Sequence, residues 1–328
     1  MKKIEPAVMS LVVGFSVPFG QSSFTADLSQ MASIANRRFY RQGLNWAVAG
    51  FKVRLVGQGT GSVGVSKLPT TWTFGNSWVK GFKTWQEMNK KALDGVESVK
   101  GRFLDFKIYA DQTHHAAGYG ANLLPQDEIG GTTTAGEWIP SEIRIPDNSA
   151  FPANSAAFEV IGVGDNYPGP GFSGVNAVSL VQGYANSRAL PLQADPNTPD
   201  DLIDASGATP ENWMSATSNE GTTQDSGVLD DIQAYDQPPY PFENDGVNID
   251  TQYPGGANQM PNLLPHDATD LTVTTISGSS YLKGGNFPCG LVRFNCTNQQ
   301  AEPFNLAIII DMVPGHHRGY MAESMLEM

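Results

Sequence analysis

Short apolar segments separated by turn residues limit most strongly what this chain can fold into. We expect a strand within 1–20 and further strands at 44–56, 62–68, 102–110, 137–145, 156–163, 270–277, 287–296 and 304–313. Only two helices are predicted between them, so strands and helices do not alternate one for one. This order favours a mainly β fold, an antiparallel jelly-roll sandwich or barrel with two short helices, over a doubly wound parallel sheet.

The two predicted helices begin and end at recognisable residues. Asp27 and Gln30 have the spacing of a capping box, and apolar residues follow at helical spacing until Gly43, where we expect the first helix to end. The second helix is predicted to start at Asn76 or the serine after it, to carry an aromatic stripe on one face, and to stop at Gly95.

A glycine-rich turn lies between the strands at 44–56 and 62–68, and we expect these strands to pair across it as a hairpin. Gly59, Gly61 and Gly64 also match the G-x-G-x-x-G string of dinucleotide-binding sites. That site needs a helix immediately after the glycines, whereas a strand is expected here. The hairpin turn is therefore the favoured interpretation.

Residues 164–266 differ in composition from the rest of the chain. They hold 12 of the 22 prolines and 14 acidic residues, and Arg188 is their only basic residue. Apart from a predicted helix at 174–190 they lack periodicity, so we expect a Pro-rich acidic insertion that forms an outer or inter-subunit layer; a disordered linker is the alternative. Residues 1–163 and 267–328 are expected to form one jelly-roll barrel together, because the middle of the chain has too few strand segments for a second.

Charge is distributed unevenly along the chain. Residues 1–115 carry 15 Lys or Arg against 7 Asp or Glu, whereas residues 116–328 carry 5 against 26. The two parts have net charges of +8 and −21, which together give the −13 of the whole chain. Such a protein is suited to two different environments, and its basic part is suited to a polyanionic partner. An acidic protein whose lysines happen to cluster is the alternative.

Two groups of basic residues are the candidates for contact with nucleic acid. Arg37, Arg38 and Arg41 lie at the predicted end of the first helix, where the helix dipole alone would stabilise cations. The second predicted helix carries its lysines opposite the aromatic stripe, an arrangement that a solvated helix face would explain equally well. Their occurrence in the same third of the chain favours phosphate binding. The complete set of residues predicted to face nucleic acid is Lys2, Lys3, Arg37, Arg38, Arg41, Lys80, Lys83, Lys90 and Lys91.

No catalytic residues, metal ligands or cofactor are predicted, and we do not expect an enzyme. His114-His115 and His316-His317 are adjacent pairs, and neighbours along a strand point to opposite faces, which suits metal binding poorly. Asp111 near the first pair has no accompanying nucleophile, so a surface hydrogen bond is the favoured explanation.

The remaining motifs are the two cysteines, one acidic segment and the apolar N-terminal segment. Cys289 and Cys296 lie too far apart in one predicted strand for a disulfide, so we expect free thiols made in a reducing cytosol. The acidic segment 243–250 resembles a calcium loop, but its glycine is out of register. Glu5 and Pro6 interrupt the apolar N-terminal segment, which favours a strand over a signal peptide, and no apolar run is long enough to span a membrane.

Several stretches of the chain resemble the jelly-roll major capsid proteins of small single-stranded DNA viruses and bacteriophages from aquatic samples. They are KKIEPAVMSL, NRRFYRQGLNWAVAGF, WQEMNKKAL and RFLDFKIYADQTHHAAGYGANLLP within 1–125, and the closing NLAIIIDMVP. The resemblance implies a structural virion protein, synthesised in the host cytoplasm, that self-assembles into an icosahedral shell around a genome. Many such proteins begin with a long Arg-rich arm, whereas this chain begins with only Lys2 and Lys3.

An acidic subunit cannot by itself neutralise a packaged genome. We therefore expect the nucleic acid to be accompanied by a separate basic protein, polyamines or divalent cations, or an internal membrane. In this interpretation the basic residues face inward, and the 164–266 insertion faces outward or across neighbouring subunits, where it offers a surface for a host receptor. The alternative function is a carbohydrate-binding or adhesin β-sandwich; a hydrolase would need an acid/base pair that no motif marks.

Overall fold

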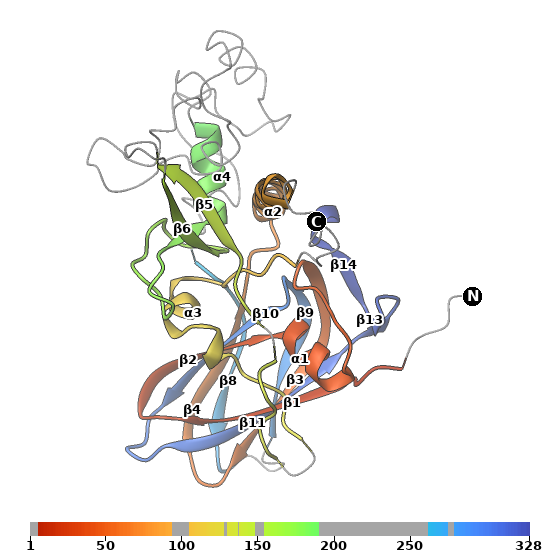
Figure 1. Cartoon of the computed structure of the whole chain (residues 1–328). Coiled ribbons are helices and arrows are strands. Elements are labelled where there is room, and N and C mark those ends of the chain that lie inside the picture. Colours follow the sequence, from red (N-terminus) through yellow and green to blue (C-terminus); the bar gives the residue numbers. More distant parts are fainter. Residues whose placement is uncertain are drawn as a thin grey trace, which may run out of the picture. The chain divides into compact units, whose positions relative to one another are not determined.

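A computed structural model describes residues 6–93, 105–127, 130–136, 138–147, 154–189, 262–274 and 279–328 (Figure 1). The chain divides into two compact units. The barrel unit comprises 1–70, 117–139 and 263–328, and the second unit comprises 71–116 and 140–262. Along the sequence, the chain therefore alternates between the units: two segments of the second unit separate the three segments of the barrel unit.

The barrel unit contains two antiparallel sheets. The first, here called the β1 sheet, runs in the order β1 (Ser10–Val17), β11 (Phe304–Met312), β3 (Leu44–Val56) and β9 (Ser279–Pro288), and the short β14 (Ala322–Ser324) also pairs with β3. The second, here called the β2 sheet, runs in the order β2 (Gly20–Asp27), β10 (Leu291–Asn298), β4 (Thr60–Lys67) and β8 (Leu264–Thr272).

The pairing order identifies the topology. Along the chain, the first of these eight strands pairs with the last, the second with the seventh, the third with the sixth and the fourth with the fifth. This is a long hairpin wrapped into two facing sheets, which is the jelly-roll arrangement. The predicted fold class, a mainly β antiparallel jelly-roll sandwich, is confirmed.

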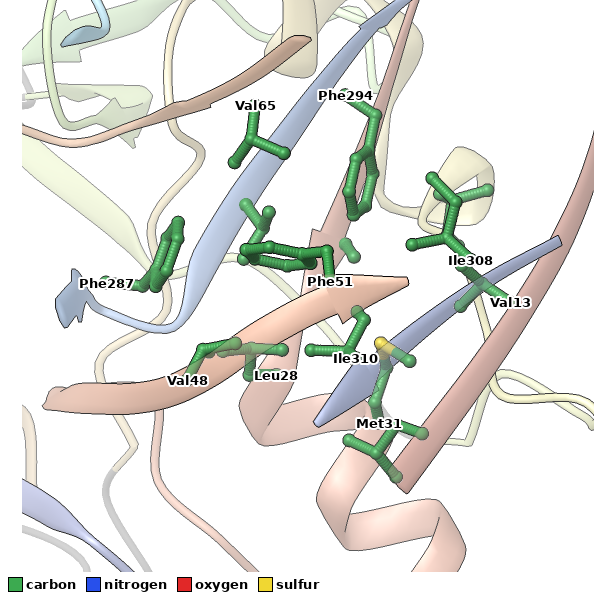
Figure 2. Close-up of a cluster of buried hydrophobic side chains, with 14 of the residues drawn as sticks. Val13, Leu28, Met31, Val48, Phe51, Val65, Phe287, Phe294, Ile308 and Ile310 are labelled. Carbon is green, nitrogen blue, oxygen red and sulfur yellow. The ribbon is translucent and has the colours of Figure 1, made fainter. Parts of the chain in front are cut away.

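The core lies between the two sheets and excludes water almost completely. Alternate residues of each strand point inward, and Figure 2 shows side chains from both sheets meeting there. Phe51 packs edge-on against Phe287 and Phe294, with ring centroids 5.5 and 5.9 Å apart. Helix α1 (Leu28–Asn36) adds Leu28 and Met31 to the same cluster. Burial of each such side chain contributes about 1.5–3 kcal/mol, so the sandwich is held mainly by this layer.

Two predictions about strand pairing were wrong. Strands β3 and β4 do not form a hairpin, because β3 belongs to the β1 sheet and β4 to the β2 sheet. Each finds its partners in the C-terminal part of the chain, and both still turn their apolar faces to the shared core. The predicted single strand at 287–296 is divided at Cys289 and Gly290, whose φ angles of 56° and 65° turn the chain from one sheet to the other.

Helix α1 is shorter than predicted. Asp27 caps it, as expected, but Gln30 does not reach back to the cap; its side chain binds Ala135 O and Asn122 instead. The helix ends at Asn36 because Arg37 adopts the left-handed conformation (φ 52°), so Gly43 lies beyond it.

The second unit combines helices with a small sheet. Helix α2 (Trp72–Leu93) begins before the predicted cap at Asn76, because the Thr71 hydroxyl accepts from Phe74 N at 3.4 Å. The other elements are α3 (Gln112–Ala117), the sheet of β5 (Glu142–Asp147), β6 (Asn154–Ile161) and β7 (Ala177–Ser179), and α4 (Leu180–Ala189). Helix α3 was not predicted, and α2, with 22 residues, is not the short helix that was expected.

An aromatic cluster joins α2 to the segment after it. Phe106 lies 5.9, 5.8 and 5.4 Å from the rings of Trp78, Phe82 and Trp85, which confirms the predicted stripe. The expected strand at 102–110 is absent from its described part, 105–110, where Tyr109 makes a single bridge to Ile161. Packing of Phe106 against α2 holds this segment together with backbone hydrogen bonds, since Tyr109 N donates to Val160 O at 2.9 Å and Gly162 N donates to Tyr109 O at 2.8 Å.

The division into units differs from the expected domain boundaries. Residues 71–116 and 140–163 were expected within the barrel but belong to the second unit, because their helices and the β5–β7 sheet pack with one another. Most of the predicted 164–266 insertion lies outside the described residues; its described beginning, 164–189, contains β7 and α4, and the predicted helix at 174–190 is confirmed in part.

Short elements complete the barrel unit. They are η2 (Tyr119–Ala121), β12 (Pro314–Gly315), β13 (Gly319–Tyr320) and η4 (Met325–Glu327). The segment after η2 covers two sheet edges: Leu123 N donates to Thr25 O at 2.8 Å and Gln126 N donates to Val12 O at 2.7 Å. These bonds satisfy backbone groups of β2 and β1 that would otherwise offer an open edge.

Candidate nucleic-acid interface

Net charge differs sharply between the barrel unit and the segment 190–261, which lies outside the described residues. The barrel unit holds 11 Lys or Arg and 11 Asp or Glu, a net charge of zero. Residues 190–261, which lie outside the described residues, hold 13 Asp or Glu and no Lys or Arg, and so account for the net charge of −13 of the whole chain. The barrel unit can therefore approach a polyanion without net repulsion.

Arg37, Arg38 and Arg41 lie in the loop between α1 and β3, and all three are exposed. Hydrogen bonds hold this loop at its beginning and its end. Tyr40 N donates to Ser33 Oγ at 3.0 Å, and the buried Gln42 donates its side-chain amide to Asp27 Oδ2 at 3.0 Å. The arginines thus project from a loop whose backbone is fixed.

The β12–β13 hairpin brings a fourth arginine to this loop. The guanidinium of Arg318 donates from Nη1 to Phe39 O, and the Tyr40 hydroxyl donates to Arg318 O at 3.0 Å. Arg318 is itself exposed and sits in the left-handed region at φ 52°. The name arginine cluster is used below for Arg37, Arg38, Arg41 and Arg318.

The positive charge of the arginine cluster affects the pKa of the neighbouring His317. Its ring lies 6.2 Å from that of Tyr40. Burial lowers the pKa of His317, and the positive charges of Arg318 and Arg41 lower it further. Acidic groups also occur on nearby strands: Asp311 accepts from Ser10 Oγ at 2.6 Å, and Glu323 stands opposite Asn45. The positive potential is therefore local to the loop and the hairpin.

The lysines of α2 do not form one surface. Lys83, Lys90 and Lys91 are exposed, but Lys80 donates to Ser187 Oγ of α4 at 2.8 Å and lies 6.0 Å from the Tyr184 ring. Glu87 is also exposed and lies one helical turn from each of the other three lysines. Lys80 therefore helps to pack two helices, and the remaining lysines share their face with a carboxylate. Lys2 and Lys3 lie outside the described residues.

Sequence reasoning missed Arg318 as a member of the cluster. The only sign of it is its position directly after His316-His317, the pair that was considered for metal binding. Nothing in the sequence shows that a hairpin more than 270 residues away meets the loop after α1; the Arg318 to Phe39 bond spans 279 positions.

The first histidine pair is buried, so the predicted surface hydrogen bond is wrong. His114 Nδ1 accepts from Ala110 N at 3.0 Å, and Asp111 accepts from the backbone N–H of His114 rather than from its ring. His115 Nε2 lies 2.8 Å from Glu159 Oε2, and the two side chains are 1% and 3% exposed. The pair has no access to a substrate, and it links α3 to β6.

Some of the other candidate motifs lie within the described residues and some lie outside them. Cys289 and Cys296 are free thiols, as expected, and both are buried. Among the described residues no three His, Cys, Asp or Glu side chains gather as metal ligands, and the segment 243–250 lies outside them. No helix within the same residues is long and apolar enough to cross a membrane.

Comparison with known proteins adds no relative. No protein-family model, curated protein or solved structure matches this chain.

Proposed function

We propose that this protein is a structural capsid protein that self-assembles into an icosahedral shell around a viral genome, as the sequence resemblance implies. The observation that carries the proposal is the eight-strand jelly-roll order of the barrel unit. Jelly rolls of this kind serve as capsid building blocks, although lectin domains and cupins use them too.

The distribution of charge favours the capsid among these uses. A neutral barrel unit with an arginine cluster suits contact with nucleic acid and with other copies of itself, whereas the sequence of 190–261, with 13 acidic and no basic residues, suits the solvent. A cupin holds a metal inside its barrel. Here the described barrel interior is lined by apolar side chains such as Val13, Phe51 and Phe294.

Partners follow from the charge of the whole subunit. At −13 per chain, the shell does not neutralise its genome, so a separate basic protein, polyamines or divalent cations accompany the nucleic acid. The second unit, which contains most of 164–266, is available to neighbouring subunits or a host receptor. The protein is then located in the virion after synthesis in the host cytoplasm.

Size-exclusion chromatography with light scattering tests the proposal on the full chain. We expect particles in the megadalton range, or pentameric pieces of them, whereas a carbohydrate-binding or adhesin protein elutes near the 35.2 kDa of one chain. A monomer at every protein and salt concentration, combined with retention on a glycan column, would favour that alternative.

A further inference from the structure

An aromatic side chain stands among the arginines. Phe39 follows Arg38 directly and precedes Tyr40 and Arg41, and it is 42% exposed. Tyr40 has the opposite fate: its ring is buried, packs 5.4 Å from that of Tyr320, and its hydroxyl binds Arg318 O. The loop thus uses one ring to anchor itself and presents the other at the surface.

We propose that Phe39 and the arginine cluster form a binding site for single-stranded nucleic acid, in which the guanidinium groups contact phosphates and the Phe39 ring stacks on a base. Guanidinium forks match phosphate oxygens, and aromatic rings stack on any base whose face is free. The proposal rests on the proposed function only for the source of the strand, which is the packaged genome.

The structure prepares this site before any ligand arrives. The guanidinium of Arg318 donates to the backbone oxygen of Phe39, and the backbone N–H of the buried Tyr40 donates to Ser33 Oγ. At the end of the loop, the Gln42 side chain donates to Asp27. A loop ordered in advance loses little conformational entropy on binding. Two segments also bring positive charge to Phe39, since Arg38 precedes it in the loop and Arg318 of the hairpin donates to its backbone oxygen.

Single-stranded nucleic acid fits the site better than a duplex. In a duplex each base face is covered by its neighbours, so Phe39 has nothing to stack on and only the phosphates remain. A ligand with phosphates alone, such as inorganic polyphosphate, would use the arginines without the ring. Comparison of the three ligands therefore separates the two parts of the site.

The first experiment measures binding of a labelled oligothymidylate to the full chain by fluorescence anisotropy at several salt concentrations. Arg37→Gln, Arg38→Gln and Arg41→Gln are combined in one variant. For single strands the slope of log affinity against log salt falls by about 0.7 for each phosphate that the protein no longer neutralises, so we expect a slope smaller by about 2. The matched control combines Lys83→Gln, Lys90→Gln and Lys91→Gln, which removes the same charge from α2 and leaves the slope unchanged.

The second experiment tests stacking with Phe39→Ala. Loss of one base–aromatic stack weakens oligothymidylate binding by roughly 5- to 100-fold and leaves polyphosphate binding unchanged. Phe19→Ala is the control, because Phe19 is 68% exposed and lies in the turn between β1 and β2, at the other end of β2 from α1. Equal circular dichroism spectra and unfolding midpoints show that each variant is folded.

Several outcomes would overturn the site. An equal decrease of the salt slope in the arginine and lysine variants would show general attraction to cations. Unchanged oligothymidylate binding by Phe39→Ala would show that the ring does not stack on a base. A duplex bound as tightly as the single strand would also contradict stacking. Shells that form normally while the arginine variant binds like the wild type contradict the site and leave the proposed function standing. Specific binding by a chain that never assembles supports the site and contradicts the proposed function.

Discussion

The indole Nε1 of Trp138 donates a hydrogen bond of 2.6 Å to Oδ2 of Asp27, which lies 111 positions earlier in the chain and is fully buried. The same carboxylate accepts from Ser29 N at 2.8 Å, as the helix cap, and from Gln42 Nε2 at 3.0 Å. One buried carboxyl group thus joins the start of α1, the loop that carries the arginine cluster, and the segment 117–139. Because the site is fully buried, loss of one donor leaves a polar atom without its partner, which is costly.

Replacement of Trp138 by Phe tests this junction. We expect Trp138→Phe to lower the free energy of unfolding by about 1–3 kcal/mol more than Trp78→Phe does. Both indoles are buried, but Trp78 Nε1 has no hydrogen-bond partner among the described residues, so the same substitution there removes ring volume without a bond. Urea unfolding measures the difference; equal decreases would contradict the role assigned to Asp27.

Gly61 and Gly64 occupy the same strand, β4, and should respond differently to Ala. A Cβ at Gly61 would lie 2.0 Å from Thr297 O, whereas a Cβ at Gly64 would have no neighbour closer than 3.6 Å. We expect Gly61→Ala to destabilise the barrel unit by about 1–3 kcal/mol, since the backbone of β10 must move. Gly64→Ala should leave stability unchanged or raise it by up to about 1 kcal/mol. Thermal unfolding of the two variants provides the comparison.

Glu159 and Glu142 offer a buried and an exposed carboxylate on neighbouring strands of the second unit. Glu159→Ala breaks the buried contact with His115, and we expect the free energy of unfolding to fall by about 1–3 kcal/mol. Glu142→Ala breaks a contact with Arg144 in which both side chains are about half exposed, and the expected decrease is below about 1 kcal/mol. Fluorescence of Trp78 and Trp85 follows unfolding of this unit. Similar decreases in both variants would show that the buried pair does not hold α3 to β6.

Buried thiols make the barrel unit sensitive to high pH. Burial raises the pKa of Cys296 to about 12, and burial together with the Asp27 charge raises the pKa of Cys289 well above 9. Above about pH 9 the unfolded chain releases these protons while the folded chain keeps them, so stability present at neutral pH is lost as the pH rises from about 9 toward 12.

The matching measurement is urea unfolding at pH 8 and pH 10 for the wild type and for Cys296→Ala. The variant is expected to be less stable at pH 8, because a small cavity forms, but its stability should decrease less between the two pH values. An equal decrease in both proteins would mean that Cys296 does not titrate as its burial requires. Neither thiol should react with a thiol reagent in the folded protein at pH 8.

The sequence predicted the fold class and several strands well, because these depend on local patterns. The strand at 44–56 matches β3 from end to end, and 304–313 matches β11 except for its last residue, since both are short apolar segments bounded by turn residues. Pairing was harder: the hairpin across Gly57 was wrong because β3 and β4 find partners more than 200 positions away, which no local pattern encodes. The strand at 102–110 failed for a related reason, since in its described part only Tyr109 makes a bridge, to Ile161, and Phe106 packs on α2.

The candidate site was predicted only in part. The run of arginines at 37–41 was visible in the sequence, but the contribution of Arg318 depends on a distant hairpin. Conversely, the sequence predicted that all lysines of α2 lie on one face, opposite the aromatic stripe. Only the position of α4 shows that Lys80 contacts Ser187. Local sequence identifies charges, whereas tertiary packing decides which of them share a surface.

The central claim is that this jelly roll is the building block of a closed shell. Electron microscopy of the purified full-length chain tests it most directly. We expect uniform closed particles in the images, each built from many copies of the protein. Images that show only separate single molecules under all assembly conditions, even at high protein concentration, would contradict the proposed shell.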